Sequence, residues 1–142
     1  MGTAHLESLN NAKTRQLQLQ LSLENINIEA SKFVMGDFNF HSTWEEQAKI
    51  TSNGYIDLYL EMNNGREDFS MLKTKQFSEW RPDKIIVPST GNKWKATDIK
   101  IVGKFSIPRF SKENIFETCQ DSIIRTPSDH MSIITTFEYK GK

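Results

Sequence analysis

The stretch FVMGDFNF, residues 33–40, decides how this chain folds. Its apolar beginning is typical of a short buried strand, which we expect over residues 31–35. Gly36 ends the apolar run, and Asp37 and Asn39 follow it. Taken alone, an acid and an amide after a glycine are more typical of a tight turn than of a site. At the end of a buried strand, however, they also stand where a sheet presents polar groups to a ligand.

Two other segments place reactive residues beside a predicted strand. Asp83 comes immediately before a buried strand that we expect over residues 84–87. The triplet Ser128-Asp129-His130 comes directly before a long strand that we expect over residues 131–139, whose alternate residues form one face. If these segments meet the end of the first strand, three carboxylates and an imidazole gather at one edge of a sheet.

Such a gathering of carboxylates needs a cation or a proton. Two like charges about 4 Å apart cost about 4 kcal/mol at an effective dielectric constant of about 20. A divalent metal ion removes this repulsion, and oxygen ligands without cysteine favour Mg²⁺ or Mn²⁺ over Zn²⁺. Because Mg²⁺ commonly shares its ligands with a substrate phosphate, the pattern indicates hydrolysis of a phosphoester. His130 would stabilise phosphoryl oxygens or exchange a proton, and Asp83 would hold its tautomer.

Each of these residues also has a plain structural interpretation. Asp83 beside Arg81 and Lys84 is typical of a surface ion pair, and Asp129 is typical of a loop cap. A single histidine such as His5 is more often a surface or core residue than a catalytic one. The functional hypothesis therefore depends on these residues occurring together.

Composition sets the class of protein. The chain has 142 residues, 37% of them hydrophobic and 25% charged, which indicates one soluble globular domain. No apolar run is long enough to cross a bilayer and no signal-peptide pattern opens the sequence, so we expect no membrane partner. The single cysteine, Cys119, excludes an internal disulfide framework and a cysteine-rich metal site. It fits a reducing compartment, so we expect a cytoplasmic or nuclear protein.

The zero net charge hides an uneven distribution. Residues 73–112 hold ten Lys or Arg residues against three acids, interleaved with aromatic residues that include Trp80 and Trp94. Nucleic-acid-binding surfaces have this composition. The same lysines would equally occupy the solvated faces of alternating strands, which is the commoner case.

The remaining patterns predict an α+β sandwich. Residues 8–24 alternate in part like a strand, but their composition and an apolar stripe at spacings of three, four and seven predict a helix. Thr43-Trp44-Glu45-Glu46 has the form of a capping box that opens a short helix. Residues 55–62 suit a short helix or an extended segment, residues 98–102 alternate like a strand, and residues 103–127 are loop-rich.

Three motifs, in this order, resemble the endonuclease/exonuclease/phosphatase superfamily of metal-dependent phosphoesterases. They are Gly36-Asp37-Phe38-Asn39, Arg81-Pro82-Asp83-Lys84-Ile85 and Ser128-Asp129-His130. The opening Thr3-Ala4-His5-Leu6-Glu7-Ser8, with Arg15-Gln16-Leu17 after it, is similar to the tyrosyl-DNA phosphodiesterase 2 branch. The resemblance implies a DNase I-like fold, a four-layer α/β/β/α sandwich. Residues 1–142 would be a single domain that forms its carboxyl-terminal half, a mixed or antiparallel sheet with helices on one face.

The same resemblance implies a role for each motif residue. Asp37 and Asn39 would orient the attacking water and contact the scissile phosphate, and His5 and His130 would stabilise the charge of the transition state. Asp83 would orient His130. The remaining expected positions are Asp129 beside the metal and Trp80, Arg81 and Ser128 against the substrate. The implied cofactor is Mg²⁺ or Mn²⁺. The implied substrate is a phosphodiester at a DNA or RNA end, a 5′-phosphotyrosyl bond in this branch, and the third alternative is a lipid or inositol phosphate.

The sequence also departs from the family pattern. Only four residues precede His5, whereas the family's metal-ligating Glu comes from a preceding half of the domain. Phe69-Ser70-Met71 stands where the family has an aromatic substrate-gripping segment, without its Trp and Asp. A lone half would expose an apolar sheet face, so we expect either a missing amino-terminal half or self-association through that face. The function is then a hydrolase half-site or, alternatively, a non-catalytic module that binds phosphate, nucleic acid or protein.

Overall fold

The computed structural model describes residues 1–8, 10–25, 33–73, 78–104 and 128–141. Within them the chain forms three helices and six strands. The strands are β1 (Gly2–His5), β2 (Val34–Asp37), β3 (Tyr55–Asp57), β4 (Asp83–Pro88), β5 (Trp94–Val102) and β6 (Ser132–Tyr139). The helices are α1 (Ala12–Asn25), α2 (Glu45–Ser52) and α3 (Leu58–Met62). This is the mixed α+β content that the sequence predicts.

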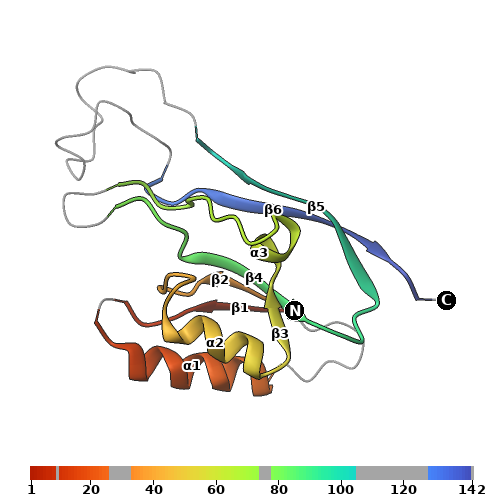
Figure 1. Ribbon diagram of the computed structural model, residues 1–142, viewed down its shortest axis with the longest axis horizontal. Coiled ribbons are helices and arrows are strands. Elements are labelled where there is room, and N and C mark those ends of the chain that lie inside the picture. The colour runs from red at the N-terminus through yellow and green to blue at the C-terminus, as the bar shows by residue number, and fades with distance from the viewer. Residues whose placement is uncertain (9, 26–32, 74–77, 105–127, 142) are drawn as a thin grey trace.

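Four of the strands form one mixed sheet in the order β1-β2-β4-β3, and β5 and β6 form a separate antiparallel pair (Figure 1). Because β1 runs parallel to β2, both strands end at the same edge, and the antiparallel strand β4 begins there. The register places His5 opposite Asp37 and Asp37 opposite Asp83. This edge, called the rim below, therefore carries the last residues of two strands and the first residue of a third.

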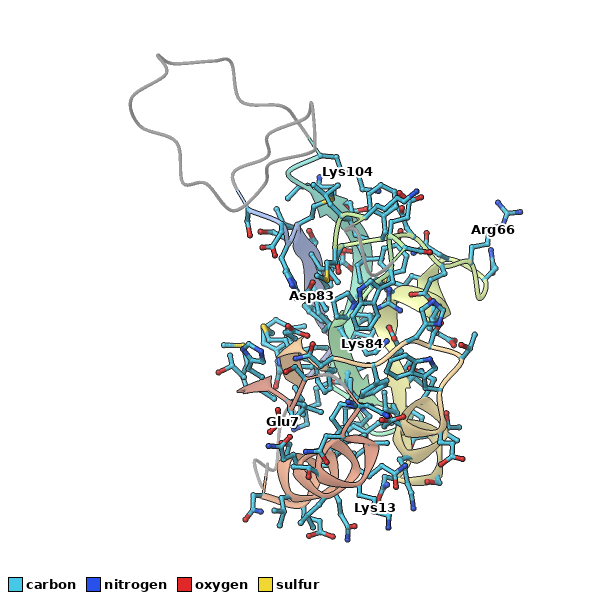
Figure 2. All side chains as sticks on the ribbon, turned by 90° about the vertical axis from the view of Figure 1, so that its left-hand side faces the viewer. Glu7, Lys13, Arg66, Asp83, Lys84 and Lys104 are labelled. Carbon is cyan, nitrogen blue, oxygen red and sulfur yellow. The ribbon has the colours of Figure 1, made fainter. Side chains whose placement is uncertain are left out.

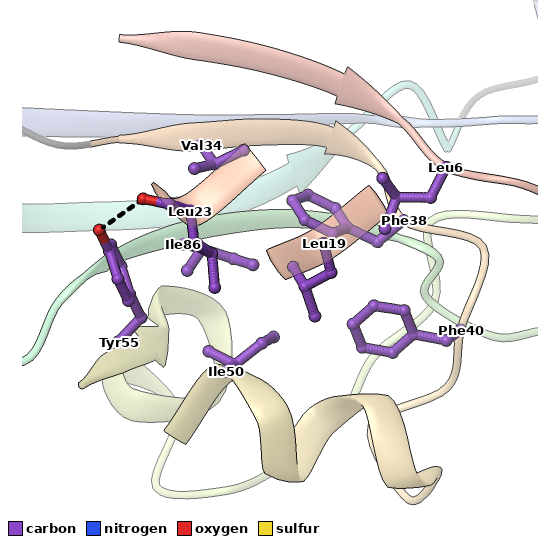
Figure 3. Packing of buried hydrophobic residues seen from close by; sticks show 9 residues of the cluster. All are labelled: Leu6, Leu19, Leu23, Val34, Phe38, Phe40, Ile50, Tyr55 and Ile86. Atoms are coloured by element: carbon purple, nitrogen blue, oxygen red, sulfur yellow. Dashed lines mark hydrogen bonds between the residues drawn. The ribbon is translucent and has the colours of Figure 1, made fainter. Parts of the chain in front are cut away.

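Helices α1 and α2 cover one face of this sheet (Figure 1). The buried side chains between these helices and the sheet form one cluster, which consists of Leu6, Leu19, Leu23, Val34, Phe38, Phe40, Ile50, Tyr55 and Ile86 (Figure 3). In α1, Arg15, Leu19 and Leu23 are buried at a helical spacing, whereas Leu17 and Leu21 point to solvent. The predicted helix is therefore confirmed, because the helical stripe reaches the core and the alternating leucines do not.

The opposite face of the sheet packs against β5 and β6. This second cluster has Phe33, Leu58, Ile85 and Val87 at its centre, with side chains of both hairpin strands packed against them. The rings of Phe33 and Phe137 stack with their centroids 4.7 Å apart. Within the described residues, the chain's own β5–β6 pair therefore packs on the face that a lone half would otherwise expose. Helix α3 also belongs to this side, so the helices do not all lie on one face.

The first predicted strand ends later than its apolar run suggests. β2 continues through Gly36 to Asp37, because both residues pair with β1 on one side and with β4 on the other. Residues 31–32, where we expected the strand to begin, lie outside the described residues. The continuation is what brings Asp37 to the rim as a strand residue rather than as part of a loose turn.

The predicted capping box is wrong. Helix α2 begins at Glu45, and its N-cap residue Trp44 makes no side-chain cap bond. The Thr43 hydroxyl contacts Nδ1 of His41 at 3.0 Å instead. Glu46 is buried and pairs with Arg15 at 2.8 Å. A long-range ion pair between α1 and α2 has therefore replaced the local hydrogen bond.

Other predicted elements are confirmed with adjusted lengths. Residues 55–62 form both alternatives, strand β3 followed directly by helix α3, and β5 begins at Trp94 rather than at residue 98. Most of the predicted loop-rich region 103–127 lies outside the described residues. In the part of the chain that the structure describes, no helix is long and apolar enough to cross a membrane.

Candidate active site

A glycine sets the spacing of the first two rim strands. Gly36 has φ +142° and pairs with Ala4 of β1, and a Cβ atom at Gly36 would collide with the carbonyl oxygen of Ala4. Any other residue would therefore force β1 and β2 apart. This close approach places the ends of the two strands, His5 and Asp37, side by side.

Five predicted residues meet at the rim, and we call His5, Asp37, Asn39, Asp83 and His130 the rim cluster. Oδ2 of Asp37 lies 3.6 Å from Nε2 of His5 and 4.0 Å from Nε2 of His130. Nδ1 of His130 lies 3.0 Å from Oδ2 of Asp83. Residues 5, 37, 83 and 130 are thus joined in one chain of contacts, although they are far apart in the sequence. Two of the three carboxylates expected here, Asp37 and Asp83, therefore meet the imidazole of His130, whereas Asp129 takes no part in these contacts.

Asn39 ties the loops after β1 and β2 together. Its backbone has φ +52°, a left-handed conformation that asparagine tolerates better than most residues. Its backbone N–H donates to Oδ1 of Asp37 at 2.9 Å, and its side-chain amide donates to the carbonyl oxygen of Leu6 at 2.8 Å. Asp37 is therefore a strand residue rather than part of a turn, and its carboxylate accepts the N–H of Asn39 in the loop that follows.

A short segment, residues 70–72, docks the loop of His130 onto the sheet. The N–H of Leu72 donates to the carbonyl of Asp129 at 3.1 Å, and Met71 forms isolated bridges with Trp80 and with His130. His130 is thereby held beside the start of β4, with Nδ1 toward Asp83. An ionised carboxylate only accepts hydrogen bonds, so Nδ1 carries the proton in this pair and Nε2 faces Asp37.

The electrostatics of the rim favour protons or cations. The hydrogen bond with Asp83 raises the pKa of His130 above 6.5, and the charges of Asp37 and Asp129 act in the same direction, while burial opposes them. Burial raises the pKa of Asp37 above 3.8, and the charge of Asp83 adds to this, while the Asn39 N–H and both histidines oppose it. The carboxylates of Asp37 and Asp83, on paired residues of β2 and β4, therefore both contact the imidazole of His130, and within the described residues imidazoles are the basic side chains that face them.

Asp129, the residue expected beside a metal, lies at the edge of the rim cluster. Asp129 and Ser128 are exposed, and the Ser128 hydroxyl accepts the backbone N–H of His130 at 3.0 Å. Among the described residues, no three His, Cys, Asp or Glu side chains are gathered closely enough to hold a metal ion. Asp37, Asp83 and Asp129 supply suitable oxygens, but the described residues do not complete a cation site.

The expectation that Arg81 binds substrate is wrong, because its side chain is 0% exposed. Its guanidinium donates to Asp57 at 2.8 Å, to Glu67 at 2.7 Å and to the backbone carbonyl of Asp83 at 3.0 Å. Lys84 is buried beside it, 3.3 Å from Asp57. We call the buried residues Asp57, Arg81 and Lys84, together with the partly exposed Glu67, the buried cluster. Figure 2 views the rim end, where the labelled neighbours Asp83 and Lys84 lie together.

Trp80, also expected at the substrate, remains partly accessible. Its indole ring lies 5.9 Å from that of Trp44, tilted by 31°, and its N–H donates to the sulfur of Met71 at 3.1 Å. Trp44 is 45% exposed, and the guanidinium of Arg15 lies 5.3 Å from its ring centroid. The pair forms an aromatic surface on the segments that leave β2 and enter β4.

The described basic residues of the stretch 73–112 do not share one surface. Arg81 and Lys84 are buried, whereas Lys95 and Lys100 lie exposed on β5. For these two strand residues the solvated-face interpretation is confirmed. Residues 74–77 and 105–112 of this stretch lie outside the described residues.

Sequence reasoning missed two contributors to the rim. Ser70 is fully buried and its hydroxyl donates to Oδ2 of Asp83 at 2.6 Å. Asp57 holds Arg81, which in turn bonds the backbone of Asp83. Neither residue carries a local signal, since Ser70 and Asp57 precede their partners by 13 and 24 residues. In the sequence, Ser70 belongs to Phe69-Ser70-Met71, the segment that lacks the Trp and Asp of the family's aromatic motif.

Comparison with solved structures identifies the fold. The structure resembles D. rerio TDP2 complexed with single strand DNA product, with a TM-score of 0.70 and 24% identity over 96% of this chain and 54% of that chain. A humanized D. rerio TDP2 with 14 mutations matches with a TM-score of 0.62 and 24% identity, over 96% of this chain and 50% of the other. An endonuclease/exonuclease/phosphatase family protein from Bacteroides thetaiotaomicron matches with a TM-score of 0.57 and 18% identity, over 95% and 47%.

These likenesses show a DNase I-like fold, the one that the sequence motifs predicted. The chain spans about half the length of the solved chains that it matches. No protein-family model matches the sequence, and no curated protein matches it.

Proposed function

We propose that the rim cluster binds and hydrolyses a phosphodiester at the end of a nucleic-acid strand, as one half of a divalent-metal-dependent phosphodiesterase site. The observation that carries the proposal is the position of Asp37, whose Oδ2 lies within 4.0 Å of the Nε2 atoms of both His5 and His130. A phosphoryl group bound at this point would contact a carboxylate and two imidazoles at once.

The roles follow from the contacts. His130 donates its Nδ1 proton to Asp83, so its Nε2 is available to donate to a phosphoryl oxygen when the imidazole is protonated. The Asp83 hydrogen bond favours that protonated form. His5, which is 77% exposed at β1's end, can supply a second donor. Donors of this kind are each worth about 10²- to 10³-fold in rate.

Asp37 and Asn39 are the groups proposed to orient the attacking water. The carboxylate of Asp37 is fixed by the Asn39 N–H through Oδ1, which leaves Oδ2 toward the two histidines. A carboxylate held in this way can accept a proton from water, and its raised pKa suits that role. Asn39 keeps its own side chain toward Leu6, so it acts here by shaping the loop.

The proposed cofactor is Mg²⁺ or Mn²⁺, which would neutralise the carboxylates and the substrate phosphate. Because the described residues do not complete a cation site, at least one further ligand must come from outside them. An amino-terminal half, or a second copy of the chain, would supply it. We therefore expect this chain alone to bind Mg²⁺ weakly and to turn over slowly.

A single-stranded nucleic-acid end is the proposed substrate. The exposed Trp44 and its neighbour Trp80 offer an aromatic surface on which a base can stack, a contact worth about 1–3 kcal/mol. Ser128, exposed beside His130, offers a hydroxyl to the strand. The D. rerio TDP2 structure was solved with a single strand DNA product. The proposed compartment is the cytoplasm or nucleus.

Hydrolysis of a 5′-phosphotyrosyl oligonucleotide, with Mg²⁺ and with a chelator, tests the proposal. We expect slow, metal-dependent release of tyrosine that falls by about 10²- to 10³-fold in Asp37→Asn and in His130→Ala. Lys95→Ala, an exposed residue on β5, is the control and should keep the wild-type rate. Hydrolysis that persists in the chelator, or in both rim variants, contradicts the proposal.

A non-catalytic module is the second candidate, and the incomplete cation site favours it. Such a module would bind the same phosphorylated strand through the rim without cleaving it. The hydrolysis assay together with a titration of the same oligonucleotide separates the two functions: binding that depends on the rim residues, without any hydrolysis in Mg²⁺, would establish the module.

A further inference from the structure

Ser70 lies between the two segments that deliver Asp83 and His130 to the rim. Its side chain is fully buried. Its backbone N–H donates to the carbonyl of Trp80 at 3.1 Å, and its own carbonyl accepts the N–H of Met131 at 2.6 Å. One residue therefore binds the chain just before Asp83 and the chain just after His130, and fixes the distance between them.

The side chain of Ser70 continues this bridge. Its hydroxyl donates to Oδ2 of Asp83 at 2.6 Å and lies 3.4 Å from the backbone N–H of the same residue, which can donate to it. Oδ2 is also the oxygen that receives Nδ1–H of His130 at 3.0 Å. Two donors thus converge on one carboxylate oxygen. The direction of the Asp83–His130 hydrogen bond depends on that oxygen staying where both donors can reach it.

We propose that Ser70 is a positioning residue for the Asp83–His130 pair. It rests on the proposed function, because it assigns Ser70 to the same rim. The hydroxyl holds the Asp83 carboxylate in the rotamer that accepts from Nδ1 of His130. The imidazole consequently keeps its proton on Nδ1 and presents Nε2 to Asp37. Without the hydroxyl, the carboxylate turns about its terminal torsion, which is broad for aspartate, and the histidine loses its preferred tautomer.

The structure also explains why a hydroxyl is needed rather than only a small residue. Alanine would preserve the packing and every backbone bond of Ser70 but would leave Oδ2 with one donor instead of two. Threonine would keep the hydroxyl and add a methyl group. If Ser70 has only a structural role, the effect of each variant should depend on how well its side chain fits the site. If Ser70 is a positioning residue, Ser70→Thr should keep the tautomer ratio of His130 and Ser70→Ala should change it.

The direct test is the tautomer of neutral His130, measured by nitrogen NMR of its ring in the full chain. We expect Ser70→Ala to lower the ratio of the Nδ1–H to the Nε2–H form by about tenfold, the scale for losing a hydrogen bond to a charged group. Ser70→Thr should keep the ratio within about twofold of wild type. Ser89→Ala is the matched control, because Ser89 bonds Gly54 at the far end of β4 and should leave the ratio unchanged.

Each outcome decides the inference. A folded Ser70→Ala variant with the wild-type tautomer ratio overturns it. Should Ser70→Ala not fold, Ser70→Cys, whose thiol is a weak donor, carries the same expectation and the same contradiction. In the hydrolysis assay, Ser70→Ala should lower kcat by about tenfold with KM unchanged. If the rim variants leave hydrolysis unchanged, only the proposed function is contradicted, because the tautomer measurement does not depend on turnover.

Discussion

Two groups of charged side chains flank the start of β4, and they differ in nearly every physical respect. The buried cluster pairs two acids with two bases; its Asp57, Arg81 and Lys84 side chains are at most 1% exposed, and Glu67 at its margin is 24% exposed. The rim cluster places two carboxylates against imidazoles, and the side chains of Asp37 and His130 are 16% and 30% exposed. Residues 81 and 84 belong to the first group and residue 83 to the second.

The difference separates structure from function. A buried ion is tolerated only when partners satisfy it, and in the buried cluster Asp57 contacts both Arg81 and Lys84. Within the described residues, the two rim carboxylates pair with imidazoles and remain partly exposed, so a ligand can reach them. Balanced and enclosed charge holds the fold together, whereas unbalanced and accessible charge marks the place where a proton, a cation or a phosphate can bind.

Removing the centre of the buried cluster should have the largest effect on stability. Asp57→Ala leaves Arg81 and Lys84 buried with one acid between them, so we expect the free energy of unfolding to fall by about 3–5 kcal/mol. Denaturant unfolding measures it. Glu61→Ala, an exposed acid on the adjoining helix α3, is the control and should change stability by less than about 0.5 kcal/mol. A loss below about 1 kcal/mol for Asp57→Ala would remove the distinction between the clusters.

Replacing Arg81 should have a smaller but specific effect. Arg81→Lys keeps the charge but cannot reproduce hydrogen bonds to Asp57, Glu67 and the Asp83 carbonyl together, so we expect a loss of about 1–3 kcal/mol. Arg66→Lys, at an exposed arginine (Figure 2), should be neutral within about 0.5 kcal/mol. If Arg81→Lys left stability unchanged and weakened only substrate binding, Arg81 would belong to the rim after all.

The dependence of stability on pH should reveal the hydrogen bond between His130 and Asp83 at the rim. Its pKa is raised above 6.5 in the folded chain, mainly by the Asp83 hydrogen bond, so the imidazolium stabilises the fold. This contribution is fully present below pH 6.5 and is lost as the pH rises through the folded-state pKa. In chelator, the stability difference between wild type and His130→Gln should therefore be larger at about pH 6 than at about pH 8. A difference that grows with pH would contradict the assigned hydrogen bond.

Removing the most exposed member of the rim should have the smallest effect on stability. His5 is 77% exposed, so we expect His5→Ala to change the free energy of unfolding by less than about 0.5 kcal/mol. The same variant should slow phosphodiester hydrolysis by about 10²- to 10³-fold. Equal rates for wild type and His5→Ala would exclude His5 from the site.

The sequence predicted those features of helix α1 and of the rim that depend on local residue patterns. Helix α1 followed from a stripe that buries Leu19 and Leu23, and the meeting of Asp37, Asp83 and His130 followed from motifs at strand ends. In both cases the relevant spacing is visible in the chain itself. The family resemblance added the order of the motifs, and the fold agrees with it.

The burial of Arg81 could not be predicted in the same way. A basic residue beside Asp83 fits a substrate contact, and only the position of Asp57, 24 residues earlier, shows that the guanidinium turns inward. Similarly, the position of Glu46 in the sequence fits a capping box, whereas in the structure its carboxylate pairs with Arg15 of α1. Both errors have one cause, which is that long-range ion pairs override local signals and leave no local trace.

The most direct test of the whole account is whether the rim binds the phosphate of a nucleic-acid end. The chain has three histidines, and two of them, His5 and His130, belong to the rim cluster. Titration with a 5′-phosphorylated single-stranded oligonucleotide in Mg²⁺, followed by NMR of the histidine rings, should shift both of these signals saturably. The same oligonucleotide with a 5′-hydroxyl should shift them less. If neither ring responds, or if the shifts appear on the outer face of β5 and β6 instead, the rim is not the binding site.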